Sequence, residues 1–352
     1  MGQQQSAFVV EIASPRLGNF QSLPQTDPDE DERSSSQWRI TVNPSANFFS
    51  TSDELKSLIN KLYRTQNCCS LITPSEAKYL CTALKCIDIS SDILLPLLTV
   101  ISNATAYTAN QYLFAQFGIT EKVASMMKNC HAALPNSSKV MLLQCIANMA
   151  TCRENIEILQ QTIALVVKRL NSSLDMERTV AFQALTNLSY TITRSQVDSI
   201  LPAIPVCLKR LWEKGEANIN SLRLLVNLSC CPDMVPHILA AKTVTGLLSI
   251  LDTDKPEILL RAITWLLCMS SAVHALSLTY EVIAPLNQDP FANPNYTIYF
   301  SIYAPKGRQE LIKRLNSIAV GNDETALKAK TLLEILGKIP EARPLLSNLN
   351  RL

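Results

Sequence analysis

The stretch Ser221-Leu-Arg-Leu-Leu-Val-Asn-Leu-Ser-Cys230 decides the fold. Its apolar side chains cover almost the whole circumference of a helix, a pattern typical of a helix packed between other helices rather than facing water. Similar segments begin at Leu97, Leu142, Ala181 and Arg261. Aligning the five segments gives five equivalent positions, which we call the phase residues: Asn103, Asn148, Asn187, Asn227 and Leu267. The chain therefore contains an internal repeat built around a largely buried helix.

The spacing of the repeat predicts the architecture. Successive phase residues are 45, 39, 40 and 40 positions apart, and a period of about 40 to 47 residues is typical of armadillo and HEAT arrays. Amphipathic stretches between the buried segments, such as 156–170 and 204–212, supply the outer helices. We therefore predict an all-α fold, an armadillo-like right-handed α-solenoid of about six to seven repeats.

Composition agrees with a helical fold and excludes several kinds of site. Of the 352 residues, 47% are hydrophobic, which is too many for a disordered chain. The net charge of +2 gives no indication of nucleic-acid binding. Only 8 residues are Gly and the two closest are fourteen positions apart, so phosphate-binding loops with clustered glycines are excluded. The 11 Cys and 3 His show no zinc-ligand spacing. We expect no metal and no cofactor, and the many unpaired thiols suit a reducing compartment.

The chain divides into three regions. Residues 1–48 hold a Gln run, several Pro and the acidic segment 27–32, a composition that predicts a disordered tail. Residues 49–340 form the predicted repeat domain, and 341–352 a C-terminal tail. Thr73-Pro-Ser-Glu76 has the pattern of a capping box, and Gly321-Asn322 is expected to end one helix and cap the closing helix over 326–336. The uncharged stretch 262–280 is long enough to span a membrane, but its phase predicts a buried helix of the repeat.

An insertion at about 285–305 interrupts the helical period. The octet Tyr296-Thr-Ile-Tyr-Phe-Ser-Ile-Tyr303 alternates in a way that predicts a strand. Two interpretations remain open. The aromatic side chains of Tyr296, Tyr299, Phe300 and Tyr303 either pack on the last repeat or form a docking element for a partner.

Several short motifs resemble a known family, the armadillo-like domain of the X-linked armadillo (Alex) proteins and the C-terminal domain of the G-protein-coupled-receptor-associated sorting proteins. The resemblance covers Leu71 to Lys338 and rests on Leu71-Ile-Thr-Pro74, on residues 103–111 and on Leu224-Leu-Val-Asn-Leu-Ser229. It implies a non-enzymatic adaptor and, in the Alex branch, attachment to the mitochondrial outer membrane and engagement with organelle transport machinery. The amino-terminal membrane anchor of that branch is missing from this sequence.

The N-terminus offers another means of attachment. Met1-Gly-Gln-Gln-Gln-Ser6 matches the N-myristoylation motif, with Gly2 as the acceptor after removal of Met1. One myristoyl chain binds membranes with an association constant of only about 10⁴ M⁻¹. The sequence therefore predicts a protein held reversibly at a cytoplasmic membrane face, with the mitochondrial outer surface as one possible location.

The recurring Asn marks the candidate binding site. In armadillo folds the third helix of each repeat lines a concave groove, where an Asn amide can bind the backbone of an extended or helical peptide segment. The alternative is that these amides tie neighbouring helices together. One turn earlier the chain has no Trp array to hold Lys side chains, and Arg223 favours neutral or acidic peptides. The candidate groove residues are Asn103, Asn148, Asn187, Asn227, Thr99, Gln144, Gln183 and Arg223.

Two function classes follow. We expect a non-enzymatic protein-interaction scaffold, tethered through Gly2, that binds protein partners and the membrane surface but no nucleic acid. The alternative is an enzyme or small-molecule carrier whose pocket is assembled from distant residues, since no catalytic grouping of Ser, His and Asp or of paired carboxylates is visible in the sequence.

Overall fold

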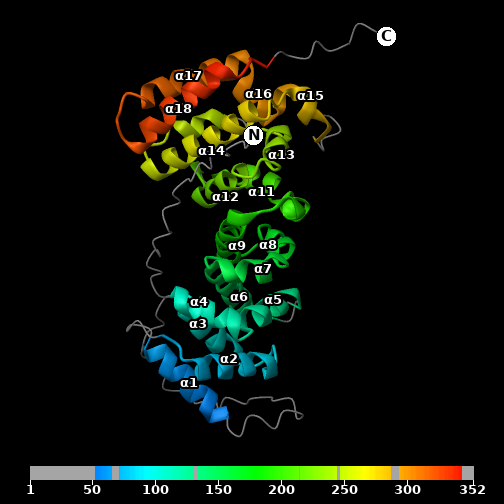
Figure 1. The fold of residues 1–352 in the computed structure, drawn as a ribbon, viewed down its shortest axis with the longest axis vertical. Coiled ribbons are helices and arrows are strands. Elements are labelled where there is room, and N and C mark those ends of the chain that lie inside the picture. Colours follow the sequence, from blue (N-terminus) through cyan, green and yellow to red (C-terminus); the bar gives the residue numbers. More distant parts are fainter. Residues whose placement is uncertain are drawn as a thin grey trace, which may run out of the picture. The chain divides into compact units, whose positions relative to one another are not determined.

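The computed structural model describes residues 52–65, 71–129, 134–213, 215–243, 246–286 and 293–342. Most of these residues are helical (Figure 1). The α-helices are α1 (Ser52–Thr65), α2 (Pro74–Cys86), α3 (Leu94–Ala104), α4 (Thr108–Gln116), α5 (Ile119–Lys128), α6 (Asn136–Met149), α7 (Arg153–Gln160), α8 (Ile163–Arg169), α9 (Asp175–Leu188), α10 (Val197–Ile200), α11 (Ala203–Lys209), α12 (Ile219–Ser229), α13 (Val235–Ala240), α14 (Pro256–Ala275), α15 (Tyr280–Ile283), α16 (Ile298–Tyr303), α17 (Pro305–Ile318) and α18 (Glu324–Lys338).

Short elements join these helices. The 3-10 helices are η1 (Ser189–Thr191), η2 (Arg194–Gln196), η3 (Leu247–Leu251), η4 (Ala284–Leu286) and η5 (Pro294–Tyr296). A small antiparallel hairpin pairs β1 (Trp212–Glu213) with β2 (Glu216–Ala217), and Gly215 in its turn adopts a φ of 82°, which favours glycine. The hairpin lies between α11 and α12 and leaves the helical succession intact.

One helix of each repeat packs directly on its counterpart in the next. The packed series is α3, α6, α9, α12, α14 and α18, and Figure 1 shows these helices following one another in chain order. The first five overlap the buried segments found by the repeat search, and α18 overlaps the predicted closing helix over 326–336. We call them the ladder helices. The four inner helices, α6, α9, α12 and α14, have a ladder helix on either side, so their apolar residues are buried over most of the circumference.

Two further helical segments complete each repeat. The pairs α4 and α5, α7 and α8, α10 and α11, α13 and η3, and α16 and α17 precede successive ladder helices, while α1 and α2 precede the first. The described residues therefore form six three-helix repeats, in agreement with the predicted all-α, armadillo-like solenoid of about six to seven repeats.

The core runs without interruption through the described repeats. In α12, Leu222, Leu224, Leu225 and Leu228 are fully buried, as the opening sequence pattern predicts. The longest helix, α14, is apolar and long enough to cross a membrane by length and composition, but half of its apolar window is buried within the protein. It packs against α12 and α18 around the fully buried Trp265. The prediction that this stretch is a core helix of the repeat agrees with that packing.

Helix caps confirm one sequence prediction and correct another. Thr73 and Glu76 form the predicted capping box at the start of α2: Thr73 Oγ1 accepts from Glu76 N, and the Glu76 carboxylate accepts from Thr73 N at 2.9 Å. At the closing helix the cap is Asp323, whose Oδ1 accepts from Ala326 N at 2.8 Å, rather than Asn322. The carboxylate of Asp323 takes this place because α18 begins at Glu324, two residues earlier than predicted.

The aromatic octet is not a strand. Its last six residues form α16, and Thr297 caps this helix by accepting from Phe300 N at 3.3 Å. Tyr299 and Phe300 pack against Tyr280, with the Tyr280 and Phe300 ring centres 4.8 Å apart, and Tyr303, one turn after Tyr299, packs against Tyr299. The strand prediction was wrong because almost every side chain of this short helix is buried. When no face of a segment is exposed to solvent, the order of its apolar and polar residues does not distinguish a strand from a helix.

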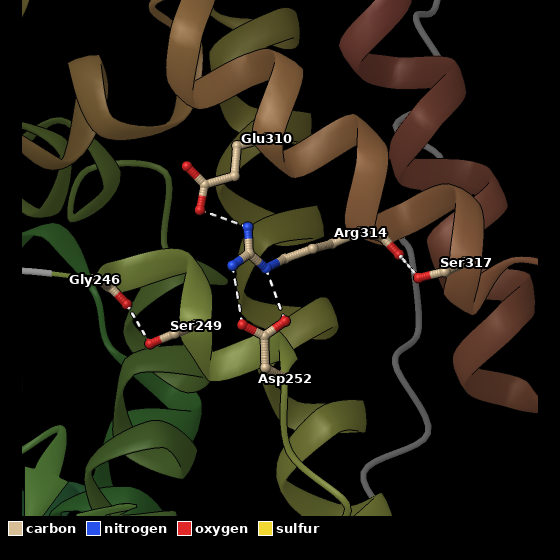
Figure 2. A network of polar contacts seen from close by, with 6 residues as sticks. All are labelled: Gly246, Ser249, Asp252, Glu310, Arg314 and Ser317. Atoms are coloured by element: carbon tan, nitrogen blue, oxygen red, sulfur yellow. Dashed lines mark hydrogen bonds and ion pairs between the residues drawn. The ribbon is translucent and has the colours of Figure 1, made fainter.

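An ion-pair network joins the last two repeats (Figure 2). Arg314 on α17 donates to both carboxylate oxygens of Asp252, at 2.8 and 2.9 Å, and to Glu310 at 2.5 Å. Asp252 directly follows η3, whose first turn is closed by a hydrogen bond from Ser249 Oγ to Gly246 O. This bidentate contact lowers the pKa of Asp252, because the guanidinium stabilises the charged carboxylate.

Candidate functional site

The predicted groove residues line one face of consecutive ladder helices. Thr99 and Asn103 lie on α3, Gln144 and Asn148 on α6, Gln183 and Asn187 on α9, and Arg223 and Asn227 on α12. Within each helix the two residues are four positions apart and therefore share a face. Asn103 is exposed and the others are half-buried. We call this set the ladder face.

Each of the last three Asn side chains bonds the preceding ladder helix. Nδ2 of Asn148 donates to Ser102 O at 3.0 Å, Nδ2 of Asn187 to Ala147 O at 2.7 Å, and Nδ2 of Asn227 to Thr186 O at 2.7 Å. Each acceptor belongs to the residue just before the Asn of the previous repeat. These carbonyls lie in the last turn of their helices, where no backbone N–H of the helix is available. The Asn amides therefore act as side-chain caps between repeats.

The amide oxygens are used differently along the ladder face. Asn148 Oδ1 accepts from Gln144 Nε2 at 2.9 Å. Within the described part of the chain, Oδ1 of Asn187 and of Asn227 accepts no hydrogen bond, and the Gln183 side chain makes none. Because Nδ2 of Asn187 and of Asn227 is bonded to the neighbouring helix, each Oδ1 has a defined position. The ladder face around α9 and α12 thus presents polar groups that are oriented and unused.

Arg223 corrects one sequence-based expectation. Its guanidinium forms an ion pair with Glu257 on the next ladder helix, α14. The charge that favoured acidic peptides is therefore offset by a carboxylate on the same surface. The pair of Arg223 and Glu257 carries no net charge, so it gives no reason to prefer an acidic ligand over a neutral one.

Two buried Asn residues form a second set of inter-repeat bonds that sequence reasoning missed. Asn110 Nδ2 donates to Ala104 O at 3.0 Å, and Asn155 Nδ2 donates to Met149 O at 3.2 Å, in both cases the last residue of a ladder helix. Asn155 also accepts from Thr120 Oγ1 at 2.8 Å. Asn110 and Asn155 are 45 positions apart, the same step as Asn103 to Asn148. That shared step is the signal that could have identified them.

A pair of thiols lies at the C-terminal part of the same surface. Sγ of Cys230, the residue that ends α12, is 3.9 Å from Sγ of Cys268 on α14. Nζ of Lys328 on α18, which bonds Thr264 Oγ1 at 3.2 Å, acts electrostatically on both thiols. The two Cys are 38 positions apart, close to the repeat period, and this spacing could have indicated their proximity.

The insertion residues lie mostly in the core. Tyr299, Phe300 and Tyr303 are buried, and the Tyr303 hydroxyl is 3.0 Å from Ser270 Oγ on α14. Only Tyr296 is exposed, at 60% of its surface. Three of the four proposed contact residues are therefore unavailable to a partner, and their burial is that expected if the octet packs on the last repeat. Gly2 lies outside the described residues.

The described residues offer little for metal or acid-base chemistry. No group of three or more His, Cys, Asp or Glu among them is arranged to hold a metal ion. His237 on α13 is half-buried, and burial lowers its pKa against the opposing effect of Asp198 and Asp233. Glu177 on α9 is buried beside Arg169, with 3.5 Å between Oε1 and Nη1.

Solved structures with similar folds include designed armadillo repeat proteins. One solved structure of similar fold is a crystal structure of an engineered protein, which aligns over 82% of this chain and 66% of its own length with 17% identity and a TM-score of 0.59. A computationally designed armadillo repeat protein for modular peptide recognition aligns over 62% of this chain and 94% of its own, with 18% identity and a TM-score of 0.53. A designed armadillo repeat protein in complex with the peptide (KR)4 aligns over 74% and 99%, with 15% identity and a TM-score of 0.53.

Sequence comparison gives the family. No curated protein matches the chain significantly. The family model described as Armadillo-like, however, matches residues 73–279, more than half of the chain. The matched region begins at the capping box of α2 and extends beyond the end of α14, and therefore contains five of the six ladder helices. The chain belongs to the Armadillo-like family.

Proposed function

We propose that this protein is a non-enzymatic interaction scaffold that binds an extended polypeptide segment along its ladder face. The observation that carries the proposal is the pair Asn187 and Asn227, whose Nδ2 atoms are bonded within the protein and whose Oδ1 atoms are left over. An extended peptide exposes backbone N–H groups, which can donate hydrogen bonds to these amide oxygens. Gln183, one turn before Asn187, adds a donor and an acceptor on the same face.

The chemistry of the ladder face indicates the kind of segment. The face carries amides and a hydroxyl from α3 to α9, and its Arg223 is paired with Glu257. We therefore propose a neutral, polar segment recognised mainly through its backbone. Peptide recognition by the designed armadillo repeat proteins of similar fold supports this use of the surface.

A selection experiment tests the binding surface. A random linear peptide library displayed on phage is selected against the full chain, and the affinities of enriched peptides are measured for the protein and its variants. We expect Gln183→Ala to bind about twofold to tenfold more weakly and the double variant Asn187→Ala, Asn227→Ala at least about fivefold more weakly, since each lost hydrogen bond removes about 0.5–1.5 kcal/mol. Gln183→Ala leaves the inter-repeat bonds intact, so its effect does not depend on stability.

The control for this experiment is Asn171→Ala, which removes an exposed amide between α8 and α9, away from the ladder face. It should bind the selected peptides as the unmodified protein does. If enriched peptides bind all variants equally, the ladder face is not the binding surface.

We further propose that the scaffold is held reversibly at a cytoplasmic membrane face through a myristoyl group on Gly2. The motif Met1 to Ser6 supports this proposal, and the resemblance to the Alex proteins makes the mitochondrial outer surface a candidate location. Labelling of cells with alkynyl myristate tests it, with Gly2→Ala as the control. An equal signal from both proteins, or none from either, would contradict the proposal.

A further inference from the structure

Two thiols from neighbouring repeats face each other on the protein surface. Cys230 is the C-terminal cap residue of α12, and Cys268 lies within α14, the next ladder helix. Their sulfur atoms are 3.9 Å apart, and Cys230 is exposed while Cys268 is half-buried. A disulfide needs a sulfur separation of about 2.0 Å. Cys230 is the first residue after α12, so disulfide formation requires a movement of its side chain at the end of a helix.

The surroundings distinguish these two thiols from other cysteines of the core. Hydrogen bonding from Cys268 and the positive charge of Lys328 lower the pKa of Cys230 to about 7, despite partial burial. The proximity of Cys230 and burial raise the pKa of Cys268. By contrast, complete burial raises the pKa of Cys145 to about 12, and that thiol donates to Leu98 O at 3.4 Å. Cys230 therefore combines access to solvent with a pKa below that of an ordinary thiol, the properties of an oxidisable cysteine.

We propose that Cys230 and Cys268 form a peroxide-sensitive dithiol, which hydrogen peroxide converts into a disulfide that links α12 to α14. Cys230 is the attacking residue because it is exposed. Cys268 is the resolving residue because it is the nearest thiol and is fixed within a packed helix.

The chemistry takes two steps. The Cys230 thiolate attacks one oxygen of hydrogen peroxide; a sulfur–oxygen bond forms and the oxygen–oxygen bond breaks. The departing hydroxide takes the proton released by the Cys230 thiol and becomes water, leaving Cys230 as a sulfenic acid. The sulfur of Cys268 then attacks the Cys230 sulfur, the sulfur–oxygen bond breaks, and the hydroxide leaves as water with the proton of the Cys268 thiol. The two thiols lose two electrons in total, and one peroxide is reduced to two waters.

The position of the pair gives oxidation a structural consequence. Cys230 lies three residues after Asn227, and Cys268 directly follows the phase residue Leu267. The disulfide would therefore join two neighbouring ladder helices next to the ladder face. The oxidation itself does not depend on the proposed peptide binding, and its test uses no peptide.

Peptide mapping tests the proposal directly. The folded full chain, fully reduced beforehand, is treated with a small excess of hydrogen peroxide at pH 7, alkylated and digested with trypsin. Cleavage after Arg223 and Lys242 and after Arg261 and Lys306 places Cys230 and Cys268 on separate peptides, 224–242 and 262–306. We expect these two peptides to be recovered as one cross-linked species that dithiothreitol separates.

Two variants identify the sulfur atoms involved. Peptide 224–242 also contains Cys231, so Cys231→Ser should keep the cross-link. Cys268→Ser should lose it, and Cys230 should then accumulate as a sulfenic acid that dimedone traps. The proposal is overturned if Cys230 and Cys268 are both recovered as alkylated thiols after a treatment that oxidises other cysteines. It is also overturned if the cross-link disappears in Cys231→Ser. Circular dichroism of each variant shows whether it is folded.

Discussion

Asn187 and Asn227 illustrate how single side chains connect the repeats. Each donates its amide to a carbonyl in the last turn of the preceding ladder helix, at 2.7 Å. Such carbonyls have no partner within their own helix, so the side chain supplies a bond that the backbone cannot. The same residue thus joins two repeats, while its amide oxygen accepts no hydrogen bond from the described residues.

Asn227→Ala should lower the free energy of unfolding by about 1 kcal/mol, since it removes one hydrogen bond and leaves Thr186 O with one partner fewer. Urea denaturation of the variant measures the change. The matched control is Asn171→Ala, whose exposed side chain makes no hydrogen bond with the described residues, and which should stay within about 0.5 kcal/mol of the unmodified protein. Equal midpoints for both variants would contradict the capping role.

Cys230 should titrate at lower pH than an ordinary thiol. The hydrogen bond from Cys268 stabilises the thiolate and, with Lys328, lowers the pKa of Cys230 to about 7. The rate of Cys230 alkylation by iodoacetamide should therefore rise with pH and reach half of its maximum near pH 7. Cys268→Ala removes the hydrogen bond, so the midpoint should move to higher pH. An unchanged midpoint in that variant would show that Cys268 does not act on Cys230.

At the scale of elements, the backbones of α16 and α17 approach each other so closely that one position has room only for glycine. Gly307 lies in the first turn of α17, where an added Cβ would stand 2.1 Å from Ser301 O on α16. No side chain fits that space unless the two helices separate. The short α16 also carries the aromatic cluster and joins α14 through the hydrogen bond between Tyr303 and Ser270. Gly307 therefore permits the turn that places α16 in the core.

Gly307→Ala should destabilise the protein by about 2 kcal/mol or more, because it forces overpacking against backbone. Thermal unfolding followed by circular dichroism measures this loss. Gly337→Ala is the matched control, because an added Cβ at Gly337 on α18 meets no atom within 4 Å. That change should leave stability equal or raise it by up to about 1 kcal/mol, since Ala has the higher helix propensity. Equal loss in both variants would contradict the assigned contact.

The octet Tyr296 to Tyr303 also shows where sequence periodicity fails. A strand was predicted because apolar and polar residues alternate. In the structure Ile298, Tyr299, Phe300, Ile302 and Tyr303 are all buried in α16. When a short segment is enclosed by neighbouring repeats, neither a period of 2 nor one of 3.6 is imposed by solvent. The type of such an element is decided by its caps, here Thr297 before the helix and Pro305 after it.

At the scale of the molecule, stability depends on contacts between neighbouring repeats. Each ladder helix packs on the next, so the free energy is spread over successive interfaces. The Arg314 network is a polar contact of this kind: it connects α17 in the last described repeat to Asp252 in the one before (Figure 2).

Asp252→Asn should lower the free energy of unfolding at pH 7 by no more than about 1 kcal/mol, because the pair is partly exposed and screened by water. Arg314 lowers the pKa of Asp252 in the folded state. The stabilisation is therefore fully present above the unfolded pKa of about 4, and it is lost as pH falls through the lower folded value. Denaturation of both proteins from pH 7 to pH 3 should show the difference shrinking at acidic pH. The control is Asp254→Asn, at a carboxylate without an ion pair among the described residues, which should stay within about 0.5 kcal/mol of the unmodified protein at pH 7.

The charge of the ladder face predicts which peptides the protein rejects. The designed neighbour was solved with (KR)4, whereas the charged residue of the ladder face is a cation, Arg223, and the carboxylate beside it, Glu257, is already paired. We expect no saturable binding of fluorescent (KR)4 in anisotropy titrations at low salt, with the designed armadillo protein as the positive control. Tight binding that weakens with salt would contradict the proposed neutral character of the ladder face.

The sequence by itself determined the repeat, its period and the positions of the ladder helices, which are buried on opposite faces. A ladder helix that is buried between two others needs apolar residues around most of its circumference. Such apolar segments recur in the sequence at steps of 45, 39, 40 and 40 residues, so the repeat can be recognised from the sequence alone. The capping box at Thr73 was predictable for the same reason, since its bonds are local.

Only the tertiary structure decided what the polar residues do. The repeat search located Asn148, Asn187 and Asn227, but their partners lie 40 to 46 positions away on another helix. The pairing of Arg223 with Glu257, the meeting of Cys230 with Cys268 and the clamp of Arg314 on Asp252 likewise join segments 34 to 62 positions apart. Hydrogen bonds and ion pairs act over about 3 Å in specific directions. A repeat period indicates which helices are neighbours, but the rotation and offset of those helices decide which polar atoms come within that distance.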